Sequence, residues 1–386
     1  FNDCNSYIDL YAYSMIKKIL FISRPTLFTG PGGDTVQLVK TKEYLEMLGL
    51  DIDIHVGGDI NFDSYDVVHF FNLRNPQDIL HYVRLAREKN KPMVLSTIWG
   101  SYYECDQKAR RGIQKWVANN FKESFVEYLK TVARIIKNKN FHAGTFEYIL
   151  KGHLAAQKEI VNTIDVLLPN SPTELERVRN DMRQPNKEGI SVANAVDLNI
   201  FDYDKVDATK YQHLEGCLLS AARIEIRKCQ LDLIRACKDL PYKIVLVGKP
   251  SPNSIKYFEQ CKNEAGPNVI FIEHVTQQEL AALYKVAKSH ALISWMETPG
   301  LSTLEAAVMN CNVLVTDRGD TEYYFSDEAI YCEPGDVNSI RQGVIDVMSK
   351  EYSPHLKHRV MSHFTWKHTA QQTLEGYQLA LSQHIK

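Results

Sequence analysis

Residues 294–307 read SWMETPGLSTLEAA, and the predicted fold follows from the order of elements in this motif. An apolar strand ends within it, a loop containing Gly300 follows, and a helix begins in the next residues. Gly300 has no side chain, so backbone amides can approach a phosphate closely, and the start of a helix adds partial positive charge. Glu297, at the strand tip, can reach a sugar ring, and Glu305, about one turn into the helix, can bind a pair of ribose hydroxyls. Two exposed surface glutamates at a helix start remain the alternative interpretation.

A second stretch, SAARIEIRK at residues 220–228, directly follows another apolar strand. Arg223 offers a planar fork of donors and Lys228 a mobile point charge, and both suit the oxygens of a pyrophosphate. A solvated basic turn is the alternative for this stretch taken alone. With the Gly300 loop and Glu305, the two cations predict a nucleotide-diphosphate clamp within one domain.

Short apolar strands alternate with amphipathic helices from Met15 onward, which is typical of parallel sheets covered on both faces. The first series of expected strands is Ile19–Ile22, Asp51–Val56, Val67–Phe71, Met93–Thr97 and Val166–Pro169, with a helix at Thr35–Leu48. The second series is Cys217–Ala221, Lys243–Val247, Val269–Ile272, Ala291–Ser294 and Val313–Thr316. Two such series predict an α/β protein with two facing, Rossmann-like, doubly wound domains that bind ligands at the carboxyl ends of their strands.

The chain of 386 residues is long enough for two domains. We expect an N-terminal domain at residues 15–200, a C-terminal domain at residues 201–365, and a final helix within 366–386 that packs back across the junction. Residues 1–14 (FNDCNSYIDLYAYS) lack the basic start and apolar core of a signal peptide. We expect them to lie outside the fold.

Charge and cysteine content restrict the class of protein. The chain has 45 basic and 47 acidic residues, a formal net charge of −2, whereas a dedicated nucleic-acid binder carries a large basic excess. No apolar run approaches the roughly 18–20 residues that span a bilayer, so we expect a soluble protein. The eight cysteines are scattered without a Cys-x-x-Cys pair, which favours reduced, mostly buried thiols in a cytoplasmic enzyme over a disulfide scaffold or a zinc site.

Residues 107–140 differ from the rest of the chain in charge. They hold nine lysines and arginines, at positions 108, 110, 111, 115, 122, 130, 134, 137 and 139, against Glu123 and Glu127. Apolar residues recur there at three- and four-residue steps, which predicts one or two amphipathic helices. The segment is either a core-packing helix with a solvated basic face, or a face that meets an anionic acceptor or the inner surface of the cell membrane.

Together these motifs resemble the retaining glycosyltransferases of glycosyltransferase family 4, which have the GT-B fold. Glu297 and Glu305 within ETPGLSTLEAAVMNCNVLVTD are similar to that family's donor signature, and Arg223 and Lys228 to its diphosphate-binding pair. The resemblance extends from Met15 to the end of the chain and is stronger in the second half. Further matching motifs are Gly32-Gly33, Leu168–Ser171, Asn194–Asp197 with Phe201, and Phe364–Trp366.

The resemblance implies that the N-terminal domain binds the acceptor and the C-terminal domain the donor, and it implies a role for each matched residue. Glu297 would contact the transferred sugar, Arg223 and Lys228 would stabilise the departing diphosphate, and these three would form the catalytic set. No metal ion or other cofactor is implied, because the cationic pair neutralises the leaving group. The implied donor-binding residues are Gly32, Gly33, Gly248, Glu297, Gly300, Leu301, Ser302 and Glu305.

The first half departs from the family at one informative position. Many members have Thr-x-His-Gly after a first-domain strand, whereas this chain has Thr97-Ile98-Trp99-Gly100, so Trp99 stands in place of the histidine. Which residue makes the donor-sugar contact of that histidine is left open. The candidates for acceptor contacts at this edge of the sheet are His69, Trp99, Glu104 and Asp106.

The resulting hypothesis is a retaining hexosyltransferase that uses a UDP- or GDP-sugar as donor. Its acceptor would be a saccharide or a lipid-linked saccharide, in bacterial surface polysaccharide assembly. Two alternatives remain open: a sugar-nucleotide epimerase of the same architecture, and a non-catalytic nucleotide-sugar-binding subunit.

Overall fold

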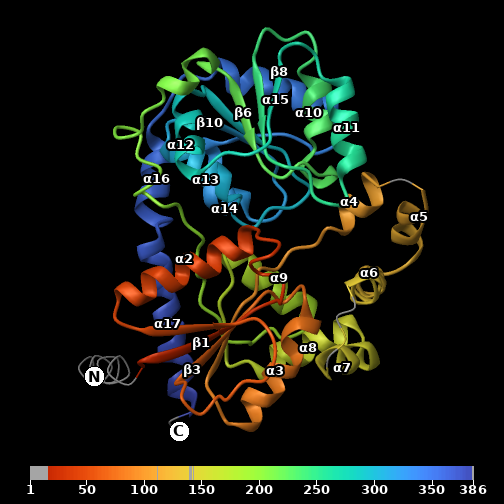
Figure 1. Cartoon of the computed structure of the whole chain (residues 1–386), viewed down its shortest axis with the longest axis vertical. Coiled ribbons are helices and arrows are strands. Elements are labelled where there is room, and N and C mark those ends of the chain that lie inside the picture. Colours follow the sequence, from red (N-terminus) through yellow and green to blue (C-terminus); the bar gives the residue numbers. More distant parts are fainter. Residues whose placement is uncertain (1–15, 111, 139–140, 142, 385–386) are drawn as a thin grey trace. The chain divides into compact units, whose positions relative to one another are not determined.

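The alternation of strands and helices builds two separate parallel sheets (Figure 1). The computed structural model of the chain describes residues 16–110, 112–138, 141 and 143–384. Its contacts define two units. The first contains the chain up to Gly100, Asn120–Asn194 and the end of the chain from Trp366, and the second contains Ser101–Asn119 and Ala195–Thr365. The extension expected at residues 1–14 lies outside the described residues.

The first unit contains a sheet of parallel strands in the order β2-β1-β3-β4-β5. The strands are β1 (Lys18–Ile22), β2 (Asp51–His55), β3 (Val67–Phe71), β4 (Met93–Ser96) and β5 (Val166–Leu167). The helices are α2 (Gly33–Met47), α3 (Pro76–Glu88), α6 (Glu123–Asn138), α7 (Ala143–Lys151), α8 (His153–Thr163), α9 (Pro172–Met182) and α17 (Trp366–His384).

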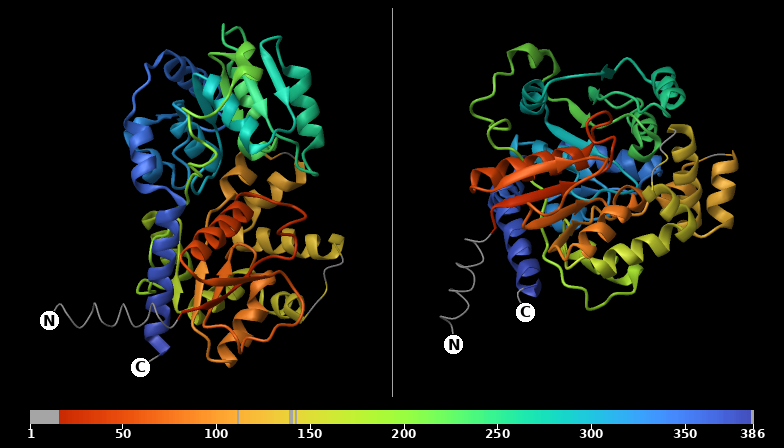
Figure 2. Two further views of the ribbon diagram at one scale, coloured as in Figure 1. Left: turned by 60° about the vertical axis from the view of Figure 1, so that its left-hand side comes forward. Right: turned by 60° about the horizontal axis from the view of Figure 1, so that its bottom comes forward.

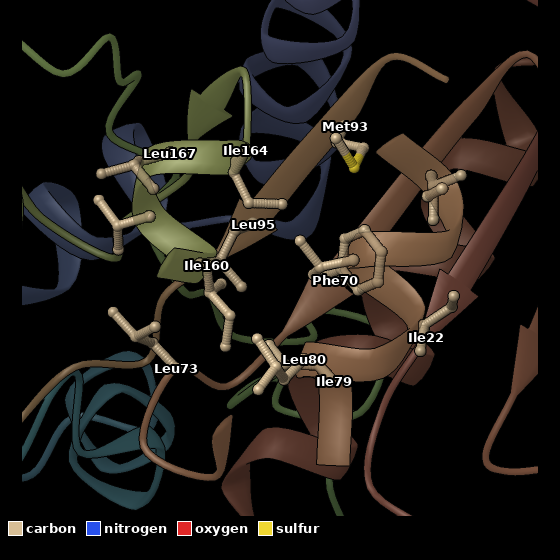
Figure 3. Close-up of a cluster of buried hydrophobic side chains, with 14 of the residues drawn as sticks. Ile22, Phe70, Leu73, Ile79, Leu80, Met93, Leu95, Ile160, Ile164 and Leu167 are labelled. Atoms are coloured by element: carbon tan, nitrogen blue, oxygen red, sulfur yellow. The ribbon is translucent and has the colours of Figure 1, made fainter. Parts of the chain in front are cut away.

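Both faces of this sheet are covered, which explains why its strands are continuously apolar. In β1, Ile19 and Phe21 point into a cluster that includes residues of α2 and α17, while Leu20 and Ile22 point into a cluster with α3 and α8. Figure 3 shows part of the second cluster, where Ile22, Phe70 and Leu95 meet Ile79 and Ile160. The final helix α17 runs along the opposite face (Figure 2).

The second unit contains a sheet of parallel strands in the order β11-β10-β9-β6-β7-β8. Its strands are β6 (Leu218–Ala221), β7 (Ile244–Val247), β8 (Val269–Ile272), β9 (Ser289–Leu292), β10 (Asn312–Val315) and β11 (Ile330–Tyr331). Its α-helices are α4 (Tyr103–Lys108), α5 (Gly112–Asn120), α10 (Gln230–Ala236), α11 (Ile255–Glu264), α12 (Gln277–Val286), α13 (Leu301–Val308), α14 (Thr321–Phe325), α15 (Val337–Ser349) and α16 (His355–His363). The 3₁₀ turns are η1 (Thr209–Leu214), η2 (Ile226–Lys228) and η3 (Ser326–Glu328).

The strand order places a switch point between β9 and β6. The chain adds β7 and β8 on one side of β6 and then returns to add β9 on its other side. At such a point the connections leave in opposite directions, which opens a crevice at the carboxyl ends of the two strands. The residues that follow β6 and β9 are therefore the first place to look for a site.

The expected strands agree closely with the observed ones, and β3 and β8 have the predicted bounds. The expected β9 is shifted by two residues, and the short β11 was not expected. The units divide between Asn194 and Ala195 rather than after residue 200, and Ser101–Asn119 belongs to the second unit. Sequence order could not reveal that assignment, because it depends on side-chain contacts of α4 with the second unit.

The described residues of the basic segment 107–140 form the end of α4, α5 and α6, in agreement with the expected amphipathic helices, while residues 111, 139 and 140 lie outside the described residues. Within the part of the chain that the structure describes, no helix is both long and apolar enough to cross a membrane.

A buried histidine links α17 to the first sheet. His69 of β3 is fully buried, and its ring nitrogens lie 2.8 Å from the Tyr377 hydroxyl and 2.9 Å from Ser96 Oγ. Gly376 allows this approach, because a Cβ there would lie 2.5 Å from Leu168 Cδ2. Burial lowers the pKa of His69 to about 3, so the ring is neutral and makes one bond as donor and one as acceptor.

Replacing Tyr377 by phenylalanine should destabilise the first unit. Tyr377→Phe leaves one nitrogen of His69 without a partner, and such a buried polar group costs about 1–3 kcal/mol of the free energy of unfolding. Urea denaturation followed by circular dichroism measures this loss. In the control Tyr352→Phe, the lost hydroxyl belongs to a side chain that is 45% exposed, and we expect a change below about 0.5 kcal/mol. Equal stability losses in the two variants would contradict the stabilising role of the Tyr377–His69 hydrogen bond.

Candidate active site

Strand β9 delivers Glu297 to the switch point of the second sheet. After β9 the chain forms a short loop, and α13 begins at Leu301 with Gly300 as its N-cap. Gly300 has φ 64°, in the left-handed region that a glycine adopts without strain. Leu301 and Ser302 lie half-buried in the first turn of α13. The predicted strand–loop–helix unit is therefore present, and the first turn of α13 directly follows the loop that carries Glu297.

A glycine that the sequence analysis did not single out supports Glu297 from the neighbouring strand. Gly319, after β10, forms a bridge with Glu297, and the Asp320 amide donates to the Glu297 carbonyl at 3.0 Å. A Cβ on Gly319 would lie 1.8 Å from that carbonyl oxygen, so any side chain would displace the loop. The sequence signal that could have identified Gly319 is its position in Thr316-Asp317-Arg318-Gly319, directly after an apolar strand. A glycine at such a place often allows a close backbone approach.

The structure brings Lys228 and Glu297 into direct contact. Lys228 ends the turn η2 after β6, and its Nζ pairs with Glu297 Oε1. Both side chains are only 11% exposed, so this ion pair is well shielded from solvent. Charges in such surroundings interact more strongly than surface pairs. The sequence placed the two residues in one clamp, and their direct ion pair is a finding of the structure.

Arg223 and Gly248 lie beside this pair at the ends of β6 and β7. Arg223 is exposed just beyond β6. A Cβ on Gly248 would lie 2.0 Å from the Ala222 carbonyl oxygen, so Gly248 lets β7 end against the backbone that leads into Arg223. The structure thus gives Gly248 a structural role in shaping the loop, alongside the donor contact that the sequence predicts.

Glu305 has an unusual environment for a carboxyl group. It lies on α13, and the Tyr284 hydroxyl donates to its Oε2 at 3.4 Å. Burial raises the pKa of the Glu305 carboxyl to about 8, against the lowering effect of the Tyr284 hydrogen bond. The residue nevertheless keeps part of its surface exposed. At neutral pH the carboxyl group is therefore largely protonated and can both donate and accept hydrogen bonds.

Gly32 and Gly33 lie at the start of α2 in the first unit. Gly32 is the N-cap with an extended backbone, and its amide donates to Thr35 Oγ1 at 3.0 Å. Arg24 donates to both carboxylate oxygens of Asp34, at 2.6 and 3.0 Å, which ties the loop after β1 to the helix start. Gly33 is exposed.

His69 and Trp99 have different surroundings in the first unit. His69 is fully buried and bonded through both nitrogens, so it has no surface for an acceptor and we drop it from the acceptor candidates. Trp99 is half-buried, and its Nε1 donates to Asp181 Oδ2 at 2.7 Å. Its ring borders a pocket of about 240 Å³ that Arg74, Lys122 and His153 also line. Trp99 remains an acceptor candidate.

A buried polar network holds the backbone of Trp99 in place. The Trp99 amide donates at 2.9 Å to Glu174 Oε1, which also accepts from Thr97 Oγ1. Asn170 donates to the other oxygen of Glu174 at 3.0 Å and accepts from Asn194 Nδ2 at 3.0 Å. Asn170 and Asn194, which belong to two motifs of the family resemblance, thus help to order the carboxyl edge of the first sheet.

Glu104 and Asp106 lie on α4 in the second unit, and neither presents a free carboxylate. Arg318 donates to both oxygens of Glu104, at 2.9 and 3.2 Å, and Lys108 donates to it at 2.7 Å. These hydrogen bonds, that from Arg318 above all, lower the pKa of the Glu104 carboxyl. Asp106 is buried and pairs with Arg110 at 3.2 Å. Their partners satisfy them within the second unit, and we assign neither to an acceptor.

The described cysteines are inert structural residues. All seven are buried and unpaired by disulfides, and burial raises the thiol pKa of Cys229 and Cys311 among others.

Comparison with known proteins agrees with this arrangement. Residues 209–362 match the family described as "Glycosyl transferases group 1", so the match covers the sheet, the Lys228–Glu297 pair and α13. A curated relative is the serotype-specific mannosyltransferase WbdA of Escherichia coli, 28% identical over 208 residues. That alignment covers 49% of this chain and 25% of the relative, so the chain spans about a quarter of that protein's length.

Solved structures extend the likeness to nearly the whole chain. Sucrose-phosphate synthase from Thermosynechococcus elongatus matches with a TM-score of 0.69 and 16% identity, over 92% of this chain and 97% of that one. Anabaena Alr3699/HepE, solved in complex with UDP, matches with a TM-score of 0.66 and 13% identity, over 94% of this chain and 99% of that one. With its two parallel-sheet α/β domains, the chain has the GT-B fold that these structures share.

Proposed function

We propose that the protein is a glycosyltransferase that moves a sugar from a nucleotide-diphosphate sugar to a saccharide or lipid-linked saccharide. The observation that carries this proposal is the shielded Lys228–Glu297 pair at the switch point of the second sheet, beside the start of α13. This geometry offers a cation and a helix N-terminus to a diphosphate and a carboxylate to the sugar attached to it. The group 1 match over the same residues supports it.

In the proposed reaction, the bond between the anomeric carbon and the diphosphate oxygen breaks and its electron pair leaves with the nucleoside diphosphate. The acceptor hydroxyl forms the new bond to the anomeric carbon, and its proton passes to the departing phosphate. Lys228 and Arg223 stabilise the negative charge that develops on the diphosphate. Because the leaving group stays on the face where the acceptor attacks, the anomeric configuration is retained, as in glycosyltransferase family 4.

Donor identity and the need for a metal are further parts of the proposal. UDP-sugars are the first candidates, because Anabaena HepE was solved with UDP, and GDP-sugars are the second. We propose a hexose as the transferred sugar, since the relative WbdA is named a mannosyltransferase.

Arg223 and Lys228 supply the positive charge that a metal ion would otherwise bring, so we propose metal-independent transfer. The relative WbdA is also named serotype-specific, which supports a role for this protein in bacterial surface polysaccharide assembly in the cytoplasm.

The first unit would bind the acceptor and approach the membrane that carries it. Exposed apolar side chains follow one stripe of α6, where Phe125, Leu129 and Ile136 are 42%, 41% and 61% exposed. On α7, Phe146 and Leu150 are 58% and 89% exposed. Lysines and arginines flank them, and a helix with this combination binds the surface of an anionic bilayer.

Product analysis tests the proposed reaction against its two alternatives. The purified protein is incubated with UDP- or GDP-sugars, with and without oligosaccharide or lipid-linked acceptors, and in the presence of EDTA. We expect a glycosylated acceptor and free nucleoside diphosphate, with EDTA leaving the rate unchanged. An epimerised nucleotide-sugar formed without acceptor would instead identify an epimerase. Tight nucleotide-sugar binding without hydrolysis or transfer would identify a binding subunit.

Replacing each member of the ion pair should have a distinct kinetic effect. Glu297→Ala should lower kcat by about 10²-fold while the donor KM changes only a few-fold, because the carboxylate acts on the sugar during transfer. Lys228→Ala should lower kcat and raise the donor KM, because the ammonium binds the diphosphate before and during transfer. Steady-state kinetics measures both parameters. A Glu297→Ala variant that keeps a rate within a few-fold of the wild type contradicts the role of Glu297.

The protonation of Glu305 should make stability depend on pH. Below pH 4.5 the folded and unfolded chains both hold the proton, whereas between pH 4.5 and about 8 only the folded protein keeps it. The unfolded state is therefore favoured increasingly as pH rises through this window. Glu305→Gln removes the titration, so its melting temperature relative to the wild type should rise from pH 5 to pH 8.5.

Thermal unfolding at the two pH values measures this difference. The control is Glu259→Gln, which changes an exposed glutamate on α11 and should show no such trend. A difference between Glu305→Gln and the wild type that is the same at both pH values would show that Glu305 ionises normally.

The apolar stripe of α6 predicts membrane binding. Co-sedimentation with vesicles of phosphatidylglycerol and phosphatidylcholine should pull down the wild type and fail for the double variant Phe125→Ser, Ile136→Ser. Pure phosphatidylcholine vesicles should bind weakly, because they lack the negative charge that attracts the basic residues. The double variant should keep its melting temperature, since both side chains are exposed. Binding that is equal for both proteins would rule out this surface.

A further inference from the structure

The segment 101–110, here called the α4 segment, is built into the second unit although it follows Gly100 of the first. Cys105, at its centre, is 1% exposed and lies in the same core cluster as Ile224 and Trp295. The segment lies outside residues 209–362, which match the family. A segment that precedes the matched region thus reaches the core of the second unit, in the cluster that holds Ile224 and Trp295.

Tyr102 of the α4 segment holds the loop that carries Lys228. The Arg227 guanidinium lies 4.7 Å from the centre of the Tyr102 ring, and its Nη1 donates to the Tyr102 hydroxyl. The Arg227 carbonyl accepts hydrogen bonds from the Trp295 amide at 3.0 Å and from Ser294 Oγ at 3.2 Å. Arg227 precedes Lys228, and Trp295 lies two residues before Glu297. The hydrogen bonds to the Arg227 carbonyl therefore join the loop that carries Lys228 to the loop that carries Glu297.

Glu104 binds Arg318, which lies in the loop after β10 that contacts the backbone of Glu297. The two donors of Arg318 reach separate oxygens of Glu104, a forked geometry that fixes direction as well as distance. The Arg318 carbonyl accepts from the Glu297 amide at 3.4 Å, and Gly319, the next residue, forms the bridge with Glu297. Lys108 lies 5.5 Å from the Trp295 ring and donates to Glu104, which completes the attachment.

We infer that Tyr102 and Glu104 are positioning residues of the donor site. They act through Arg227 and Arg318 on the loops that carry Lys228 and Glu297. The inference rests on the proposed function, and it adds to that site a segment that precedes the matched family region. Small displacements of reacting groups are costly, with a misplacement of about 1 Å lowering rates by up to about 10²-fold.

Variants of the full-length chain test the two positioning residues. Tyr102→Ala removes the ring and the hydroxyl, Tyr102→Phe keeps the ring beneath Arg227, and Glu104→Gln weakens the fork to Arg318. Relative to the wild type, we expect Tyr102→Ala and Glu104→Gln to lower kcat at least about tenfold with little change in acceptor KM, and Tyr102→Phe to stay within about threefold. Glu259→Gln, an exposed glutamate on α11, is the control and should match the wild type.

Hydrogen exchange provides a readout that does not require turnover. Amides of residues 294–298 should exchange faster in Tyr102→Ala and Glu104→Gln than in the wild type, while amides of β7 should not change. Wild-type kcat together with wild-type exchange in both variants would overturn the inference. If the wild type itself shows no transfer, the proposed function fails, and the exchange rates alone still decide whether the α4 segment orders these loops. Should Tyr102→Ala fail to fold, Glu104→Gln and Tyr102→Phe carry the test.

Discussion

The ion pair between Lys228 and Glu297 is the interaction on which the candidate site depends. It joins the loop after β6 to the loop after β9, and both side chains are largely buried. Removing one partner of such a pair leaves an uncompensated charge, which is far more costly than losing a surface salt bridge. The neighbouring features serve this pair: Gly319 supports Glu297 from β10, and the backbone of Arg227 fastens the turn of Lys228 to the end of β9.

Sheet topology explains why these two side chains meet at all. The strands β6 and β9 are neighbours in the sheet but far apart in sequence, since the chain completes β7 and β8 between them. Parallel strands end at one edge, so whatever follows β6 and β9 comes together there. The start of α13 is at the same edge, and its unpaired amides favour negative charge. In the proposed function a diphosphate would meet a cation and a helix N-terminus here, and Glu297 and Glu305 would contact the sugars on its two sides.

The strands and the donor motifs could be predicted because both are local signals. A run such as Ile19–Ile22 is apolar throughout, and the Gly300 loop is bounded by a strand and a helix in sequence. His69 was misjudged as an acceptor contact, although the apolar residues on both sides of it in Val67–Phe71 were a sign of burial. The buried polar groups that hold it, Tyr377 and Ser96, come from distant parts of the chain.

The placement of the α4 segment and the roles of Glu104 and Arg318 could not be predicted from local sequence. Glu104 lies in a strongly charged stretch, where a surface role is the ordinary expectation. Its partner Arg318 is separated from it by 214 residues, and only the folded second unit brings them together. Long-range ion pairs of this kind leave no periodic signal, because each residue type is common on protein surfaces.

Nucleoside diphosphate binding by the wild type and by Lys228→Ala tests whether the second unit holds a diphosphate site that depends on Lys228. Isothermal titration calorimetry with UDP, GDP and ADP, without sugar or acceptor, isolates the interaction between the diphosphate and the second unit. We predict that at least one of the three binds the wild type and that Lys228→Ala weakens that binding by at least about tenfold, the effect of losing a charge-assisted contact. Failure of all three to bind the wild type, or equal affinity for both proteins, would contradict it.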